Sequence, residues 1–299
     1  MHRVVVSTFP NAKALPLWAG LEHNLFAEHG LDFVLHETGS SKEQRSCLAA
    51  GEINIVQAAV DNALAMIKSG HDVIIFMGGE SGMNDFIVSP SIRSFSDLAG
   101  RTLAVDSPDT AYALLARKVL AEHGLQFGKD YQLRAVGNGA QRLRALKEDP
   151  TLAGAILNPP FSSEALLAGM RSLGALDELV GPYQAGGAFA LRAWADKNAT
   201  IIERYIAAYL KTLEWLGDDG NRKTAIGLLQ QRLGLTMPAA QATYEQLRDP
   251  SKGFTPRAKF NQAGFARVLD IRAETEGADA AIADPTAYVN LSFYDRVLA

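Results

Sequence analysis

Residues 31–57, LDFVLHETGSSKEQRSCLAAGEINIVQ, decide the fold class of this chain. Leu31–His36 alternates between apolar and polar residues as a strand does, and a capping box at Ser40 starts a helix that ends at Gly51. Ile53–Gln57 is a second strand. A strand, a helix and a strand of these lengths predict a βαβ unit, and therefore a parallel sheet with helices on both faces.

The same alternation extends on both sides of this stretch and then restarts. The first unit adds the strands Val4–Ser7 and Val73–Met77, and the helices Pro16–His29 and, after Asp61, a helix ending at Gly70. A second unit follows, with strands at Phe86–Val88, Leu103–Val105, Tyr131–Val136 and Ala155–Leu157, helices between them, and an isolated strand at Ala188–Leu191. The rest of the chain is patterned as helices: Thr200–Leu216, Arg222–Leu233, Pro238–Leu247 and Ala263–Glu274.

This order predicts an α/β protein with two lobes and a helical C-terminal part. We expect lobe one to comprise residues 1–85 and 190–299, with lobe two, residues 86–189, inserted between them. The isolated strands near Phe86 and Phe189 bracket the insertion, so they are the expected hinge strands. In open α/β sheets a ligand lies beyond the carboxyl ends of the strands, which predicts a ligand site in the cleft between the lobes.

Composition excludes several classes of protein. The 299 residues carry 29 Lys and Arg against 33 Asp and Glu, a net charge of −4, without a basic run that would bind a nucleic acid. One cysteine, Cys47, cannot form a disulfide within the chain or a cysteine metal cluster. No apolar run approaches the roughly 20 residues that span a bilayer.

The loops that follow the strands are rich in Ser, Thr, Asn, Asp and Gly. Such residues satisfy the free N–H groups of helix N-termini, and the same N–H groups can bind an anion. We expect Ser40, Asp61, Ser107 and Asn158 to be helix N-caps, with Pro108 in the first turn after Ser107. Their convergence on one cleft, rather than any single residue, is the functional indication.

Motifs for catalysis are absent from the sequence. The six histidines lack metal-ligand spacing, and there is no nucleophile elbow, phosphate-binding loop or dinucleotide fingerprint. We therefore expect no catalytic residue, no metal and no cofactor. The glycine-rich segment Gly78–Gly82 follows a strand that leads to the hinge, so hinge flexibility explains it.

Four stretches resemble a known family of bacterial proteins: LPLWAGLEHNLFAEHGL (15–31), LAAGEINI (48–55), DLAGRTLAVDSP (97–108) and NPPF (158–161). They are similar to substrate-binding proteins of ABC transporters, in the group that binds sulfonates, nitrate, taurine and pyrimidine precursors of thiamine. The resemblance runs through essentially the whole chain in order. It implies the type II periplasmic-binding-protein fold, in which two α/β lobes joined by two hinge strands close over one small molecule.

The resemblance also implies where the ligand is bound. Carried over position by position, the contacts of lobe one are Thr8, Asn11, Trp18, Ser40, Ser41, Asp61 and Asn62. The contacts of lobe two are Ser107, Thr110, Asn158 and Phe161. The implied partners are the small-molecule ligand and the permease and ATPase of an importer, and the implied state is a monomer.

Two departures from the family bear on function. Exported members begin with a signal segment and this chain shows none, so we expect a periplasmic protein whose segment has been removed, with a cytoplasmic location as the alternative. Some relatives are enzymes, and the alternative function is a cytoplasmic enzyme on this scaffold, such as a lyase, a decarboxylase or a pyrimidine-pathway enzyme. Against pyrimidine synthesis, Cys47 alone cannot supply the cysteine motif of the pyrimidine synthase of the group.

The nature of the ligand follows from the charges of the loops. No loop of the expected cleft contains an arginine, and Lys13 and Lys42 are its only cations. An aspartate such as Asp61 or Asp106 could accept from an amine or a ring N–H, while Trp18 or Phe161 stacks on the ring; Tyr112, in contrast, is expected in the core. These features favour a flat, nitrogen-containing or weakly acidic ligand, with a sulfonate as the competing choice.

Overall fold

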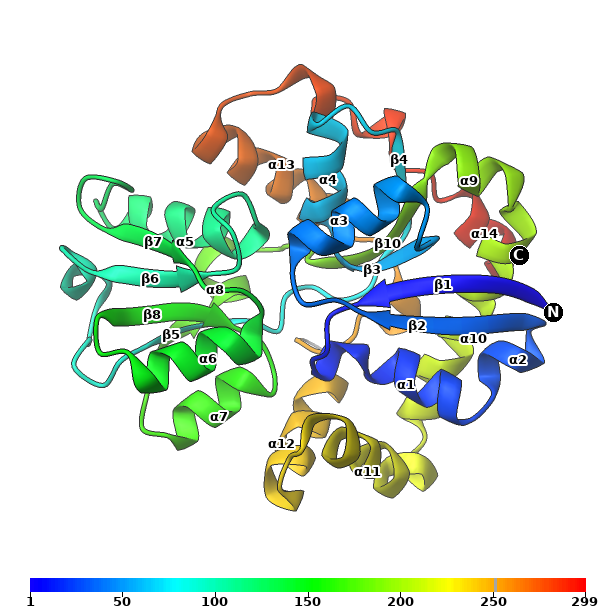
Figure 1. Cartoon of the computed structure of the whole chain (residues 1–299), viewed down its shortest axis with the longest axis horizontal. Coiled ribbons are helices and arrows are strands. Elements are labelled where there is room, and N and C mark those ends of the chain that lie inside the picture. The colour runs from blue at the N-terminus through cyan, green and yellow to red at the C-terminus, as the bar shows by residue number, and fades with distance from the viewer. Residues whose placement is uncertain (250–251) are drawn as a thin grey trace.

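Runs of four to seven residues form the strands of two sheets in the computed structural model, which describes residues 1–249 and 252–299. The strand order is β2-β1-β3-β10-β4 in the first sheet and β7-β6-β8-β5-β9 in the second, and Figure 1 shows the two sheets end to end with helices around each. The strands of the first sheet are β1 (His2–Thr8), β2 (Leu31–Glu37), β3 (Ile55–Ala59), β4 (Val73–Met77) and β10 (Gly186–Leu191). Those of the second are β5 (Asp85–Val88), β6 (Thr102–Val105), β7 (Gln132–Ala135), β8 (Leu152–Leu157) and β9 (Arg171–Ala175).

Both sheets contain the expected parallel pairs, and each also contains one strand that runs antiparallel to its neighbours. β1 pairs in parallel with β2 and β3, and β6 pairs in parallel with β7 and β8. The chain then crosses between the sheets twice, at residues 78–84 and 176–185, and each crossing is followed by a strand that runs antiparallel to its neighbours, β5 and β10. The two strands expected at the hinge are therefore present, but they pair within the sheets and are not isolated.

Helices cover both sheets. The helices of the first sheet's N-terminal part are α1 (Leu15–Glu22), α2 (Leu25–Glu28), α3 (Ser41–Ala50) and α4 (Val60–Lys68). Between β6 and β10 lie α5 (Ala111–Glu122), α6 (Gly139–Glu148), α7 (Phe161–Leu167) and α8 (Leu176–Val180). After β10 come α9 (Arg192–Lys197), α10 (Ala199–Gly217), α11 (Arg222–Leu233), α12 (Met237–Arg248), α13 (Gln262–Glu276) and α14 (Ser292–Leu298). Within the described ranges, no helix is both long and apolar enough to cross a bilayer.

Local sequence explains where several helices begin and end. The side chain of Ser40 accepts from the backbone N–H of Glu43 and caps α3, and Gly51 ends it at φ 74°, in the left-handed region that glycine tolerates. The single helix expected over residues 16–29 is two helices, because Asn24 takes φ 59° between α1 and α2. Asparagine is one of the few residues that visit this region without a large steric cost.

Four of the helices and strands were not expected from the sequence: β9, α8, α9 and α14. β9 is an edge strand with exposed or half-buried residues and contains Gly174, so it carries no apolar alternation. α8, α9 and α14 are helices of five, six and seven residues, too short for a helical period to stand out.

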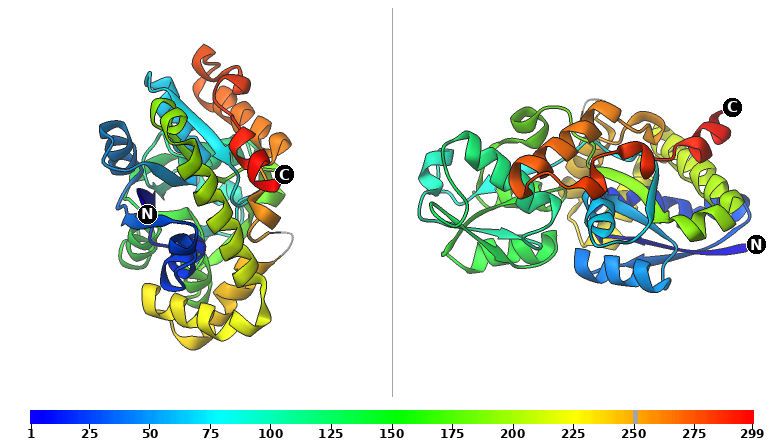
Figure 2. Two further views of the ribbon diagram at one scale, coloured as in Figure 1. Left: turned by 90° about the vertical axis from the view of Figure 1, so that its right-hand side faces the viewer. Right: turned by 90° about the horizontal axis from the view of Figure 1, so that it is seen from above.

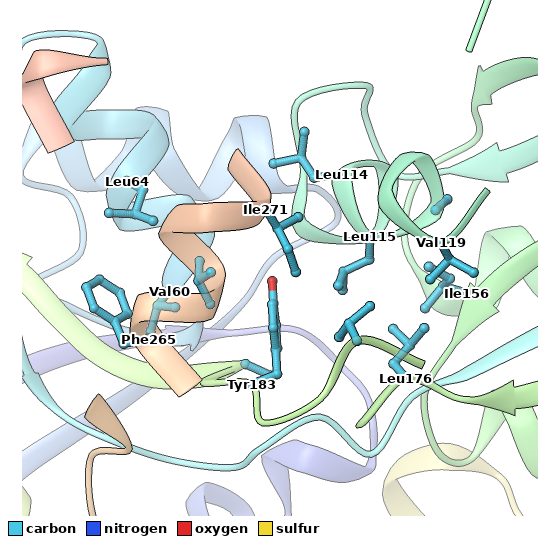
Figure 3. Packing of buried hydrophobic residues seen from close by; sticks show 14 of the residues in the cluster. Val60, Leu64, Leu114, Leu115, Val119, Ile156, Leu176, Tyr183, Phe265 and Ile271 are labelled. Atoms are coloured by element: carbon cyan, nitrogen blue, oxygen red, sulfur yellow. The ribbon is translucent and has the colours of Figure 1, made fainter. Parts of the chain in front are cut away.

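Buried side chains of the two sheets meet in a common core beside the crossings. Val60 and Leu64 of α4, Leu115 and Val119 of α5 and Ile271 of α13 belong to one buried cluster, whose arrangement Figure 3 shows. α13 packs against α5, and the orange helix lies at the junction of the sheets in Figures 1 and 2. The C-terminal part thus joins the two sheets by apolar contact, in addition to the two crossings.

Candidate ligand-binding cavity

A cavity of about 100 Å³ lies where the carboxyl ends of strands from the two sheets face each other. Residues after β1 and β3 form one wall, and residues after β6 and β8 form the opposite wall. The residues of the two crossings and of α10 close it. Its polar lining comprises Thr8, Asn11, Lys13, Ser41, Gln57, Asn62, Glu80, Asn84, Asp106, Thr110, Tyr112, Asn138, Arg142, Asn158, Tyr183 and Tyr209.

Six of the residues implied by the family resemblance come together in this lining. They are Thr8, Asn11, Ser41 and Asn62 on the first sheet's side of the cavity, and Thr110 and Asn158 on the second sheet's side. Thr8 donates from its hydroxyl to the carbonyl of Gln57, so it is held in place from the neighbouring strand. Their role as ligand contacts stays a proposal, which their common position supports.

The other five implied residues do not line the cavity, and four of them have clear reasons. Trp18 is buried in the core, where its Nε1 donates to Glu37, 2.8 Å away. Ser40 is the cap of α3, and its hydroxyl oxygen accepts from the backbone N–H of Glu43 at the start of this helix. Phe161 packs its ring against Gly139 within the apolar cluster of the second sheet. The stacking surfaces expected at Trp18 and Phe161 are therefore used by the core.

Asp61 is the fourth of these, and its expected role as an N-cap is wrong. It lies in the first turn of α4, whose cap is Ala59, and it forms a buried ion pair with Arg272 at 2.8 Å. The hydroxyl of Tyr183 donates to its second carboxylate oxygen at 2.8 Å. Both oxygens of this carboxylate thus have a partner within the protein, and the side chain is 2% exposed and lies outside the cavity lining.

Ser107 and Asn158 are not N-caps either. α5 begins at Ala111 with Thr110 as its cap, so Pro108 lies in the preceding turn, where Ser107 donates to the carboxylate of Asp109. α7 begins at Phe161 with Pro160 as its cap, and the Asn158 amide donates to the carbonyl of Pro159. Both helices therefore begin two or three residues later than these expected caps imply.

Arg142 is the most informative residue that the sequence analysis missed. It is the fourth residue of α6, which begins at Gly139, and it lines the cavity although it is only 1% exposed. Its Nη1 donates to the carbonyl of Gly137 at 2.6 Å, and its guanidinium lies over the ring of Tyr112, 5.0 Å from the centroid. Its Nε is buried without a hydrogen-bond partner among the described residues.

Burial lowers the pKa of Arg142 below its ordinary value, and the nearby Asp106 offsets part of this. Arginine nonetheless stays protonated in proteins. The expectation that Lys13 and Lys42 are the only cations of the cleft is therefore wrong, since Arg142 is in the lining and Lys42 is exposed and outside it. Tyr112 is half-buried: it packs against the core cluster, as expected, and it also lines the cavity.

Lys13, by contrast, is fully engaged by the protein. Its ammonium donates to Glu80 at 3.0 Å, to the carbonyl of Gly82 at 2.7 Å and to Asn84 at 3.2 Å. Burial lowers its pKa, but the attraction of Glu80 more than offsets this, so the pKa lies above its ordinary value. An ammonium has three donors, so Lys13 has none to spare for a ligand.

Contacts between the two walls close one side of the cavity. Arg45 of α3 and Asp109 form an ion pair at 2.9 Å, and the backbone N–H of Ser41 donates to Asp106 at 3.4 Å. On another side, the backbone N–H of Ala12 donates to the carbonyl of Pro159 at 3.3 Å. These contacts join residues of the first sheet's surroundings to loops of the second, so the structure is a closed arrangement.

The chemistry of the lining is that of recognition by hydrogen bonds. Neither His nor Cys occurs among the residues that line it. Over residues 1–249 and 252–299, no group of three His, Cys, Asp or Glu side chains is placed to bind a metal ion. Amide, hydroxyl and guanidinium groups remain, which can bind and orient a small polar molecule.

The sequence of the chain matches a known protein family. The sequence profile of the NMT1-like family matches residues 2–230. No curated protein matches the chain in sequence.

Solved structures share its fold at low sequence identity. The alkanesulfonate-binding protein SsuA from Xanthomonas axonopodis pv. citri, bound to MOPS, is 17% identical over 97% of this chain and 98% of that chain, with a TM-score of 0.80. The periplasmic nitrate-binding protein NrtA from Synechocystis PCC 6803 is 14% identical over 99% and 88%, with a TM-score of 0.81. The desulfurization enzyme DSZB is 13% identical over 100% and 99%, with a TM-score of 0.66. The chain has the periplasmic-binding-protein fold, as the sequence predicted, and belongs to the NMT1-like family.

Proposed function

We propose that this protein is the solute-binding component of an ABC importer and captures a small organic molecule in the cavity between its sheets. The observation that carries the proposal is that polar side chains from both sheets, Asn11 and Ser41 on one wall and Asn158 and Arg142 on the other, line one cavity. A ligand that touches both walls stabilises the closed arrangement, because only contacts that differ between two states can shift their populations.

The motion that the proposal requires is a rotation of two lobes. We propose that residues 1–85 and 190–299 move as one lobe and residues 86–189 as the other. The strands support this division, since β1–β4 and β10 form one sheet and β5–β9 the other, although they shift its bounds: Asp85 begins the second sheet, and residues 186–189 of β10 belong to the first. The crossings at 78–84 and 176–185 are then the hinge.

Binding is favoured over catalysis by the lining. General acid–base and nucleophilic catalysis at neutral pH most often use His, Cys or a carboxyl group that is free to exchange a proton with the substrate. The lining has neither His nor Cys, and of its two carboxylates Glu80 already accepts from Lys13 and from the backbone N–H of Gly82, which leaves Asp106 as the one carboxylate of the lining with an oxygen that no described donor reaches. We therefore propose an importer subunit that acts as a monomer outside the cytoplasmic membrane and delivers its ligand to a permease and ATPase.

The ligand that the sequence favours is a flat, nitrogen-containing or weakly acidic molecule, with a sulfonate as the competing choice. The position of Arg142 adds weight to an anionic group in either case, because an unpaired guanidinium edge suits a carboxylate or sulfonate. The name of the solved SsuA structure, an alkanesulfonate-binding protein, supports the sulfonate.

A thermal-shift screen of small solutes tests the proposal. A ligand at 100 times its Kd stabilises a protein by about 2.7 kcal/mol, which is a readily measured shift. Chromatography and mass spectrometry of the same mixture should recover the ligand unchanged. Conversion of the ligand into a product at a rate that depends on protein concentration would instead identify an enzyme.

A further inference from the structure

The cavity has two positive and two negative side chains in its lining. One positive and one negative side chain form an ion pair, and the other two do not. Lys13 and Glu80 are joined in an ion pair at 3.0 Å and neutralise each other. Arg142 and Asp106 also line the cavity, and Asp106 acts on Arg142 through its charge. However, no ion pair joins them among the described residues. Each therefore has an unused edge, a side of the charged group whose hydrogen-bonding atoms lack a partner.

The unused edge of Arg142 is fixed in position. Its Nη1 is held by the carbonyl of Gly137, and its plane is supported by Tyr112, whose hydroxyl in turn donates to Asn84 at 3.2 Å. The guanidinium therefore cannot turn to find another partner for Nε. A buried donor that the protein leaves unpaired costs free energy, and a ligand acceptor at this position removes the cost.

The unused edge of Asp106 lies on the loop after β6. One carboxylate oxygen receives the N–H of Ser41 in the first turn of α3, at 3.4 Å. No donor among the described residues reaches the other oxygen, Oδ1, and the half-buried side chain lines the cavity. Its negative charge is favourable at the N-terminus of α3, so it stays available as an acceptor.

We infer that the ligand carries an anionic group, which Arg142 receives, together with a hydrogen-bond-donating nitrogen, which Asp106 receives. The inference rests on the proposed function and deepens it, because it assigns the two ends of the ligand to two residues. The formal charges of the four lining residues sum to zero, so a ligand with one positive and one negative group leaves the closed cavity neutral. A carboxylate and a sulfonate both satisfy Arg142, and the experiment separates them.

Matched probes test the inference on the full chain by titration calorimetry. The pairs are taurine with ethanesulfonate, β-alanine with propionate, sulfanilate with benzenesulfonate, and 4-aminobenzoate with benzoate. Within each pair only the amino group differs. We expect at least one amino compound to bind about 10-fold or more tightly than its partner, since a charge-assisted hydrogen bond contributes about 1.5–3 kcal/mol.

Two variants assign the ends of the ligand. Arg142→Gln should weaken binding of both members of the pair by about 100-fold, the scale of removing one partner of a buried charged contact. Asp106→Asn should weaken only the amino member and leave its partner unchanged. Arg144→Gln, on the exposed side of α6 and paired with Glu148, is the control and should change neither. If Arg142→Gln does not fold, Asp106→Asn still decides the outcome.

Three outcomes overturn the inference. They are amino compounds that bind no better than their partners in every pair, an Asp106→Asn variant that weakens both members equally, and a folded Arg142→Gln variant that binds as the unaltered protein does. If the amino compounds bind no better, or if Arg142→Gln has no effect, the proposed function still holds as long as some solute binds and stabilises the protein in a saturable way. Failure of every solute in the wider screen to bind is the separate result that contradicts the proposed function itself.

Discussion

Asp61 and Arg272 show how a single residue can look like part of a binding site and instead hold the fold. Their ion pair is almost fully buried, with both side chains 2% exposed, and Arg272 also reaches Glu276 at 2.9 Å. Nη2 of Arg272 donates to the backbone carbonyls of Asp61 and Asp109, at 3.1 and 3.4 Å. The pair therefore connects α4, α13 and the loop before α5.

We predict that Arg272→Met destabilises the protein by about 3–5 kcal/mol, because it leaves the Asp61 carboxylate buried without its counter-charge. Urea unfolding followed by circular dichroism measures the change. Arg296→Met, which removes an exposed pair with Glu203, is the control and should cost about 1 kcal/mol or less. Equal effects of the two substitutions would contradict the structural role of Asp61.

Tyr131 gives a prediction of opposite sign. Its hydroxyl is buried without a partner among the described residues, and burial raises its pKa to about 12. Tyr131→Phe removes an unsatisfied polar atom, so we predict an increase in stability of about 1 kcal/mol at pH 7.

The same residue makes stability depend on alkaline pH. Because its pKa is higher in the folded state than the ordinary value of about 10, the unfolded chain loses the proton first, and stability falls as pH rises from about 10 through 12. Unfolding at pH 9 and 11 should show a smaller loss for Tyr131→Phe than for the unaltered protein. An unchanged difference between the two pH values would contradict this assignment.

At the scale of elements, the first crossing between the sheets is shaped by packing as well as by flexibility. A Cβ at Gly78 would lie 2.5 Å from the carbonyl oxygen of Lys259 and 2.7 Å from that of Ala258, both backbone atoms. Gly82, by contrast, takes φ 152° with nothing close to it, so there the conformation requires glycine. Hinge flexibility alone does not account for the segment.

We predict that Gly78→Ala destabilises the protein by about 2 kcal/mol or more, because neither backbone can move without disturbing the crossing. Thermal unfolding is the measurement. Gly217→Ala, at the end of α10 with open space around it and no positive φ, is the matched control and should be neutral or slightly stabilising. A neutral Gly78→Ala would show that the close approach is not a constraint.

On the scale of the whole molecule, closure depends on contacts from both sides of the cavity. Arg45 and Asp109 pair across it, but the Asp109 side chain is 47% exposed, so solvent weakens the pair. The common core around α13 also holds the two sheets together without a ligand. The expected motion is therefore a limited rotation about the two crossings.

We predict that a saturating ligand decreases the radius of gyration measured by small-angle scattering, because the ligand favours the closed arrangement. Asp109→Asn should lower ligand affinity by up to about 5-fold, the limit for an exposed pair worth about 1 kcal/mol. Asp219→Asn, whose pair with Arg248 lies away from the cavity, should leave affinity unchanged. An unchanged radius with ligand bound would contradict closure.

The sequence by itself determined the elements that short-range interactions specify. The cap at Ser40, the stop at Gly51 and the apolar period of α10 and α13 depend on residues within a few positions of one another, so the order of strands and helices could be predicted. The family resemblance rests on the same local stretches. The caps expected at Ser107 and Asn158 were wrong, because which residue caps a helix depends on the turn that the chain makes before it: α5 begins at Ala111 and α7 at Phe161.

Only the tertiary structure decided which polar side chains the cavity uses. Asp61 forms an ion pair with Arg272, 211 residues further along the chain, and the ammonium of Lys13 donates to Glu80 and Asn84. Arg142 lines the cavity because Gly137 and Tyr112 hold its side chain there, on a helix that the sequence predicts without indicating which of its side chains face the cavity. The role of a buried charged side chain depends on the partner that is buried with it and pairs with its charge. How distant segments of the chain pack decides which residue that partner is, and the neighbouring residues in the sequence do not.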